Sequence, residues 1–180
     1  MDIRLTRDGR LDPDGRTAKP HLGELVIGGG TAFASASNPS AEVIDGTGVS
    51  AGRSNGVTLT TSAGTIEIDR AGDYCVELAL SDFSCGAASG NVEFNVFYAP
   101  DGTTFAAFGA TEATGGGGRM SAIRLALTTK ESIGISKIQH LKKGSKIRAI
   151  VTSAAGNAIT CTEGSLSATQ LSDATVATPD

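Results

Sequence analysis

Two segments of the chain alternate apolar and polar residues without a break, and this pattern limits the fold more than any other feature. In the first segment every second residue is apolar: Tyr74, Val76, Leu78 and Leu80. The second segment repeats the pattern with Val92, Phe94, Val96 and Tyr98. A period of two residues is typical of a β-strand that buries one face. The sequence therefore predicts β-structure in which each strand turns one face toward a core.

Shorter segments with the same pattern follow one another along most of the chain. Turn residues separate them, as at Asn55-Gly56, Pro100-Asp101-Gly102 and Lys142-Lys143-Gly144-Ser145. The expected strands are 24–27, 31–35, 57–60, 65–68, 74–80, 92–98, 123–127, 133–135, 147–151, 158–161 and 165–171. A series of about ten short strands is typical of a sandwich or barrel. Helix is the alternative for 119–130, where alternation favours a strand, and a single helical turn is the alternative for 138–143.

The composition argues against several functions. The net charge of the 180 residues is −4, which disfavours a nucleic-acid or acidic-membrane partner. No apolar run reaches the roughly 20 residues that span a bilayer, and the first residues lack the apolar core of a secretion signal. Cys75, Cys85 and Cys161 are an odd number without a CxxC pair, which favours free thiols in a reducing compartment over one disulfide plus one thiol. We expect a protein made in the cytoplasm that binds neither membranes nor nucleic acid.

The chain divides into an N-terminal arm, one domain and a short tail. Residues 1–22 are polar and contain turn sequences, so we expect an arm that does not pack alone. The domain is expected over 23–172, and 173–180 form a small, polar, flexible tail. Four arginines of the arm are placed to grip a partner surface when it orders: Arg4, Arg7, Arg10 and Arg16. A merely disordered terminus is the alternative.

Two glycine motifs resemble catalytic sequences but lack the context that catalysis needs. Gly28-Gly29-Gly30 begins like a dinucleotide-binding fingerprint. Phe33 occupies a position that must be small and Pro39 would end the helix, so we expect a glycine turn between two strands. Gly48-Val49-Ser50-Ala51-Gly52 matches the GxSxG nucleophile elbow, but turn residues follow where a helix is required. We expect a loop serine, with His140 as the one base downstream of it.

Metal and ion sites receive little support from the sequence. The three cysteines and His140 would make a Cys3His set, but they lack the close pairs of a zinc site. Asp12, Asp14 and Asp101 lie in turns without the alternating oxygen ligands of a calcium loop. The stretch 137–148 is basic, and a solvated hairpin face is favoured over a phosphate or acidic-protein contact. We expect neither an enzyme nor a bound metal or cofactor.

Several segments resemble a known family. Residues 65–78 (TIEIDRAGDYCVEL) are similar to the T-hydrophobic-x-hydrophobic-x-x-x-G-x-Y-x-V segment of tumour-necrosis-factor-like and complement-head-like jelly rolls. Residues 138–147 (IQHLKKGSKI) resemble the late L-x-x-G-D-x-I hairpin of that family, with Ser145 in place of the usual Asp. Residues 161–168 are similar to its closing strand. The segments 23–30 and 53–58 resemble a variant found among phage virion proteins.

The resemblance covers about 23–171 and implies an all-β, antiparallel jelly-roll sandwich of about ten strands that forms a homotrimer. For function it implies a non-enzymatic virion component: a capsid decoration protein that binds the major capsid protein on the outer surface and stabilises the head. The arm would order on the shell or on a neighbouring subunit. A tail or fibre-tip adhesin that binds a host glycan is the alternative, with Tyr98, Phe105 and Phe108 as its candidate aromatic platform.

Trimer contacts need apolar side chains that point away from the core. Phe97 is out of phase with the buried residues of its strand, and Leu171 lies near the end of the last strand. Both are predicted at the trimer interface. The alternative for Phe97 is packing beneath the 115–118 loop of its own subunit. In the first case Phe97→Asp should dissociate the oligomer.

Overall fold

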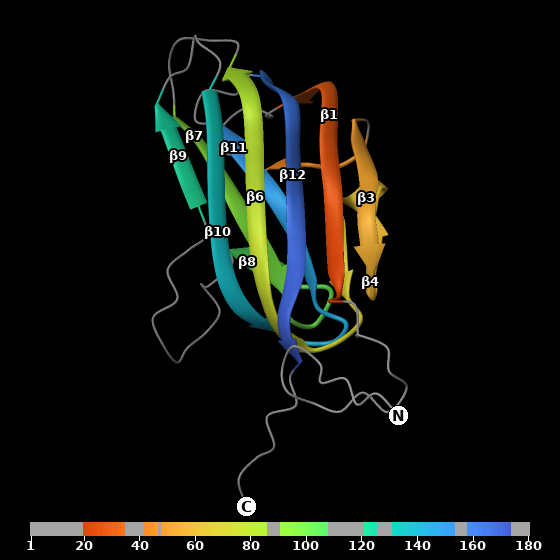
Figure 1. Ribbon diagram of the computed structural model, residues 1–180. Helices are drawn as coiled ribbons and strands as arrows, with labels where there is room; N and C mark the ends of the chain where they lie inside the picture. Colours follow the sequence, from red (N-terminus) through yellow and green to blue (C-terminus); the bar gives the residue numbers. More distant parts are fainter. Residues whose placement is uncertain are drawn as a thin grey trace, which may run out of the picture.

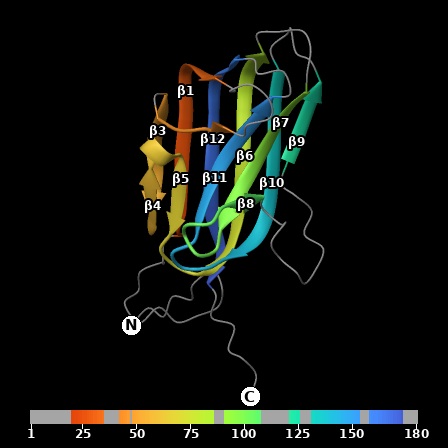
Figure 2. The ribbon, with the colours of Figure 1, turned by 180° about the vertical axis from the view of Figure 1, so that it is seen from behind.

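The protein is a sandwich of two antiparallel sheets, as Figures 1 and 2 show from opposite sides. A computed structural model describes residues 20–34, 42–46, 48–85, 91–107, 121–125, 131–153 and 158–173. Within these ranges nearly all residues lie in strands and turns, with no α-helix. The predicted all-β jelly roll is therefore confirmed.

One sheet has five strands in the order β10-β6-β12-β1-β3. Its strands are β1 (Leu22–Ala34), β3 (Val49–Asn55), β6 (Gly72–Cys85), β10 (Glu131–Leu141) and β12 (Ala158–Asp173). The other sheet has seven strands, in the order β4-β5-β11-β7-β8 with β2 beside β11 and β9 beside β7. Its strands are β2 (Glu42–Val43), β4 (Val57–Thr60), β5 (Thr65–Ile68), β7 (Asn91–Ala99), β8 (Ala106–Ala107), β9 (Ser121–Leu125) and β11 (Lys146–Ser153). A single 3-10 turn spans Thr61–Ala63.

The core lies between the two sheets and consists of the residues that alternate in the sequence. The four apolar residues of β6 from Tyr74 to Leu80 and the four of β7 from Val92 to Tyr98 are all buried. Two aromatic rings contact each other in the core, where the centroids of Phe83 and Phe94 are 4.8 Å apart in an edge arrangement. Because the aromatic content is only 4%, aliphatic side chains fill most of the remaining space.

The glycine triplet does not form the turn that the sequence predicts. Gly28 to Gly30 lie inside β1, and the pairing with β12 shifts register between Gly28 and Thr31. Similarly, 158–161 and 165–171 form one strand rather than two. Glycine permits a β-bulge as readily as a turn, and the long partner strand holds β1 extended past the irregularity. A strand was predicted for 123–127, and the structure has β9 at Ser121–Leu125. The predicted strand at 133–135 lies within β10 (Glu131–Leu141), which also includes residues 138–141, where a helical turn was the alternative.

The turn at Lys142-Lys143-Gly144-Ser145 carries the chain from one sheet to the other. Ser145 is fully buried there, and its hydroxyl donates a hydrogen bond of 2.6 Å to the carbonyl oxygen of Lys142. The carbonyl of Ser145 accepts from the amide of Ile68 at 2.9 Å, and Gly144 donates to Ile68 at 2.7 Å. The small serine thus closes its own turn through its hydroxyl group.

We expect Ser145→Ala to lower the free energy of unfolding by about 1 kcal/mol, because it removes the hydrogen bond of a fully buried hydroxyl, while the amide of Ser145 still donates to the carbonyl of Lys142 at 3.2 Å. Urea unfolding followed by circular dichroism measures the difference. Ser54→Ala is the matched control, because Ser54 is exposed on β3, and its effect should stay within about 0.5 kcal/mol. Equal stability of the two variants would contradict the role of the Ser145 hydroxyl.

Candidate functional site: the outer face of the five-stranded sheet

The outer face of the five-stranded sheet is built largely from small side chains. The strand register places its residues in rows that cross β10, β6 and β12. One row joins Gly134, Ala79 and Ser165, and the next joins Ser136, Glu77 and Ser167. Apart from Glu77, which is exposed in the second row, these side chains are small and leave a flat surface that another protein can approach closely.

One end of this face is apolar. Among the described residues the exposed large hydrophobic side chains are Ile138, with 63% of its surface exposed, and Leu171, with 55%. Ile138 lies in a row with Cys75 and Thr169, and Leu171 sits beside that row at a β-bulge in β12. This end of the face therefore offers two apolar side chains that another protein could cover.

A hydrogen-bonded pair of polar side chains borders the apolar end. Nδ1 of His140 lies 3.0 Å from Oδ1 of Asp73, in the row beyond Ile138 and Cys75. Both side chains are half-exposed. A half-exposed pair of this kind contributes little stability, and it places polar groups beside the apolar residues.

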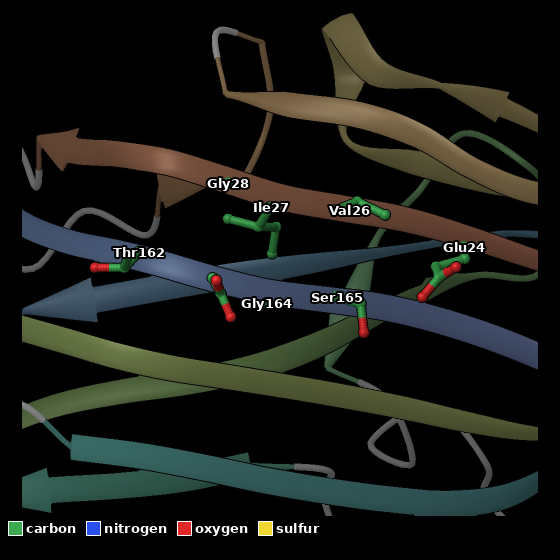
Figure 3. Close-up of a pocket in the computed structure, with 8 residues that line it drawn as sticks. Glu24, Val26, Ile27, Gly28, Thr162, Gly164 and Ser165 are labelled. Carbon is green, nitrogen blue, oxygen red and sulfur yellow. The ribbon is translucent and has the colours of Figure 1, made fainter.

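A shallow depression of about 540 Å³ lies on the same face, between β1 and β12 (Figure 3). Glu24, Val26 and Gly28 line it from β1, and Thr162 and Ser165 are among the residues that line it from β12. A Cβ at Gly28 would meet no atom within 4 Å and would therefore project into the empty space. The absence of a side chain at Gly28 thus helps to keep the depression open. The lining offers carboxylates and hydroxyls but no set of catalytic groups.

The structure separates the residues that a serine hydrolase would need. Ser50 is exposed on β3 and pairs with Val26 of β1, so GxSxG lies in a strand and not at a strand-to-helix elbow. His140 lies on β10, at the opposite edge of the sheet, and already contacts Asp73. The prediction of a loop serine was wrong in detail, because Ser50 lies in an edge strand.

The cysteines do not converge on a metal. Cys161 is buried on the core side, where burial raises the pKa of its thiol, whereas Cys75 lies on the outer face. Cys75 and Cys85 lie on one extended strand, about 33 Å apart at the usual rise per residue. A disulfide requires Cα atoms within about 7 Å, so they cannot pair within a chain. No group of three or more potential metal ligands occurs in the described part of the chain.

The basic stretch is divided between two environments rather than forming one charged face. Lys142 and Lys143 are exposed in the turn, and Lys146 lies 3.4 Å from Glu67. The guanidinium of Arg148 stacks on the ring of Phe105 at 3.8 Å, and burial lowers its pKa. These cations therefore do not compose a phosphate site.

Asp101 acts within its turn, as the sequence predicted. Its Oδ1 accepts hydrogen bonds from the amides of Thr103 at 2.8 Å and Thr104 at 2.7 Å. The two hydrogen bonds hold the pKa of the Asp101 carboxyl well below its usual range, and the bond from the amide of Thr104 has the larger effect. The four arm arginines and residues Asp12 and Asp14 lie outside the described residues.

The two predicted trimer residues lie on opposite faces of the sandwich. Leu171 is exposed on the five-stranded sheet. Phe97 is half-buried on the outer face of the seven-stranded sheet, between Arg148 of β11 and Ala107 of β8 in the strand register. The loop 115–118 that might cover Phe97 lies outside the described residues.

Ile138 was not identified from the sequence as an exposed apolar residue of a strand, because a helical turn was the alternative for 138–143. Its phase was the available signal, because Ile133, Ile135 and Leu141 occupy odd positions that face the core and Ile138 does not. The depression had no sequence signal, because it depends on how β1 and β12 pair across their irregularities.

Comparison with known proteins identifies the fold. No protein-family model matches the sequence, and no curated protein matches it. The Eiger TNF of S. frugiperda is similar in structure, with a TM-score of 0.53 and 10% identity over 89% of this chain and 98% of that chain. Murine APRIL at pH 8.0 has a TM-score of 0.53 and 15% identity over 85% of this chain and 100% of that chain. The protein therefore has the jelly-roll fold of the TNF ligands. In the described residues no helix is long and apolar enough to cross a membrane.

Proposed function

We propose that the protein is a structural module that assembles as a homotrimer through the outer face of its five-stranded sheet. The exposed pair Ile138 and Leu171 at the end of a flat face carries this proposal. Burying one such side chain contributes about 1.5–3 kcal/mol, and the small residues beside them let the partner backbone approach. The trimeric assembly of TNF-like folds supports the choice of three copies.

The solution mass tests the assembly directly. The monomer is 18.1 kDa, and we expect light scattering after size exclusion to give about three times this value. A mass that stays at the monomer value at micromolar concentration would overturn the trimer.

The biological role that we propose for the trimer is decoration of a viral capsid. The resemblance of 23–30 and 53–58 to phage virion proteins supports it, as does the arginine-bearing arm. Three weak subunit contacts on one rigid trimer would give high avidity when their spacing matches the lattice. The partner would be the major capsid protein, and the protein would reside on the virion surface.

Deletion of residues 1–20 tests the role of the arm. The variant should keep its fold and its trimeric mass, because the deletion ends before β1 begins at Leu22. Its occupancy on expanded capsids, measured by co-sedimentation, should fall by about tenfold or more, because each lost contact is repeated three times. Unchanged occupancy would contradict the capsid-binding role of Arg4, Arg7, Arg10 and Arg16.

A glycan-binding adhesin remains the second candidate, and the structure offers it little support. Tyr98 is buried and Phe105 is half-buried beneath Arg148, so neither presents a free ring face. Phe108 lies outside the described residues. Binding to a glycan array would favour this function over capsid decoration.

A further inference from the structure

The corner between β3 and β4 carries the only Asn-Gly pair in the sequence, Asn55-Gly56. Asn55 is the last residue of β3, at the edge of the five-stranded sheet. Gly56 leads directly into β4, at the edge of the other sheet (Figure 1). Gly56 has a φ of +63°, a backbone conformation that glycine adopts without strain. An asparagine that precedes a glycine also has a chemical reactivity of its own.

An asparagine side chain can react with the backbone that follows it. The amide nitrogen of the next residue attacks the side-chain carbonyl carbon, Cγ, and a new N–C bond forms. The proton of that nitrogen passes to the departing amine, the Cγ–Nδ2 bond breaks and ammonia leaves. Water then opens the five-membered succinimide at either of its carbonyl groups and yields aspartate or isoaspartate. Glycine in the next position favours the attack, because it has no Cβ and its backbone turns freely.

Asn55 is accessible to the water that this reaction consumes. Asn55 is exposed and Gly56 is half-exposed. Asn95 is the opposite case in the same chain, because it is only 7% exposed and pairs with Ile150 inside the seven-stranded sheet. The residue after it is the β-branched Val96. We therefore expect ring closure at Asn55, whereas Asn95 would first require the sheet to open.

The residues just before β1 clamp this corner in the folded protein. The side-chain amide of Asn55 donates a hydrogen bond of 3.0 Å to the carbonyl of Pro20. Nδ1 of His21 lies 3.0 Å from the carbonyl oxygen of Gly56, and since a carbonyl oxygen can only accept, the imidazole is the donor. The ring lies so close to Gly56 that a Cβ there would clash with it. Residues 20–21 and the corner thus hold each other in place.

The clamp affects both the rate of the reaction and its consequence. While Asn55 donates to Pro20, its side chain is held in one orientation, so the attack requires that this hydrogen bond open first. After hydrolysis the side chain at position 55 carries a carboxylate, which has no proton to donate. The hydrogen bond to Pro20 therefore cannot form again. Isoaspartate also adds a methylene group to the backbone at the residue that pairs with Leu22.

We propose that Asn55-Gly56 is a site of spontaneous deamidation, and that the reaction irreversibly releases residues 20–21 from the corner between the two sheets. The release should reach β12, because the carbonyl of His21 accepts a hydrogen bond of 2.8 Å from the amide of Gln170. The inference concerns the single chain and depends neither on the proposed trimer nor on the capsid partner.

Mass spectrometry of the full-length protein tests the reaction. The protein is kept at mildly alkaline pH in water enriched in oxygen-18, then digested in ordinary water, and the peptides that contain Asn55 and Asn95 are compared. We expect Asn55 to convert about tenfold faster than Asn95 or more, with one oxygen-18 atom in each converted peptide. Asn55→Gln is the matched control and should stay intact, because attack on the longer side chain has to close a six-membered ring. Conversion of Asn55 no faster than that of Asn95 would overturn the proposal.

Hydrogen exchange tests the release of the clamp. Asn55→Asp carries the charge of the product, and the amide of Gln170 should exchange about tenfold faster in this variant than in the natural protein, with β6 unchanged as the control for folding. Ser54→Asp adds the same charge at the neighbouring exposed residue and should leave Gln170 exchange as it is. Equal exchange of Gln170 in Asn55→Asp and the natural protein would show that nothing is released and would overturn that part of the proposal.

A variant of the clamp tests its control of the rate. His21→Ala removes the contact with Gly56 and leaves the reacting atoms in place. Conversion of Asn55 should become about threefold faster or more, because the corner opens more often. An unchanged rate in a folded His21→Ala variant would overturn the control by the clamp.

Discussion

The double variant Ile138→Asp/Leu171→Asp should convert the trimer into monomers of 18.1 kDa. Both side chains are exposed on the free subunit, at 63% and 55%, so the substitutions should not disturb the core. In the assembly they would place two carboxylates in each of three contacts without partners. Burial of an unpaired charge costs several kcal/mol per site, which exceeds what the small-residue face can offset. Light scattering across a concentration series measures the change.

Two further variants make the result specific. Ser62→Asp adds a carboxylate on the exposed 3-10 turn, away from the five-stranded sheet, and should leave the mass unchanged. Phe97→Asp alters the opposite face of the sandwich. If Phe97→Asp dissociates the trimer and the double variant does not, the interface lies on the seven-stranded sheet and the proposed face is wrong.

Gly64→Ala should be the most destabilising single-methyl change in the described chain. Gly64 has a φ of +58°, and a Cβ there would clash with the backbone oxygen of Ile44. The left-handed conformation alone costs about 1–2 kcal/mol for alanine. The contact is with backbone that cannot rotate away, so we expect a total loss of about 3 kcal/mol. For a domain of this size the midpoint of thermal unfolding should fall by roughly 6–12 °C.

Two other glycines separate the causes of that effect. Gly144 also has a positive φ, +80°, but a Cβ would meet nothing within 4 Å. Gly144→Ala should therefore cost only the free energy of placing alanine in the left-handed conformation, about 1–2 kcal/mol. Gly28 lacks both features, and Gly28→Ala should be close to neutral. Equal losses at positions 64 and 144 would show that the contact with Ile44 has no energetic weight.

The alternation of residues predicted most of the strands and their buried faces, but it missed β3 (Val49–Asn55), where a loop was expected. The residues of β6 and β7 that were expected in the core are buried, and so are Ile147, Ala149 and Val151 of β11. Other errors lie in glycine-containing segments such as Gly28 to Gly30, where a turn was expected within what is a single strand. Glycine is equally compatible with a β-bulge and with a turn, so its presence does not tell the two apart. The domain limits and the role of the arm stay predictions.

The sequence by itself determined which side of each strand faces the core, because side chains alternate along an extended backbone whatever the strand pairs with. Only the tertiary structure decided which outward residues become neighbours. Ile138, Cys75 and Thr169 come from three distant segments and share one row because β6 pairs with β10 and β12 in one register. Ser50 and His140 are held at opposite edges of that sheet by its strand order. Register and order depend on the packing of the whole core, so no local pattern carries them.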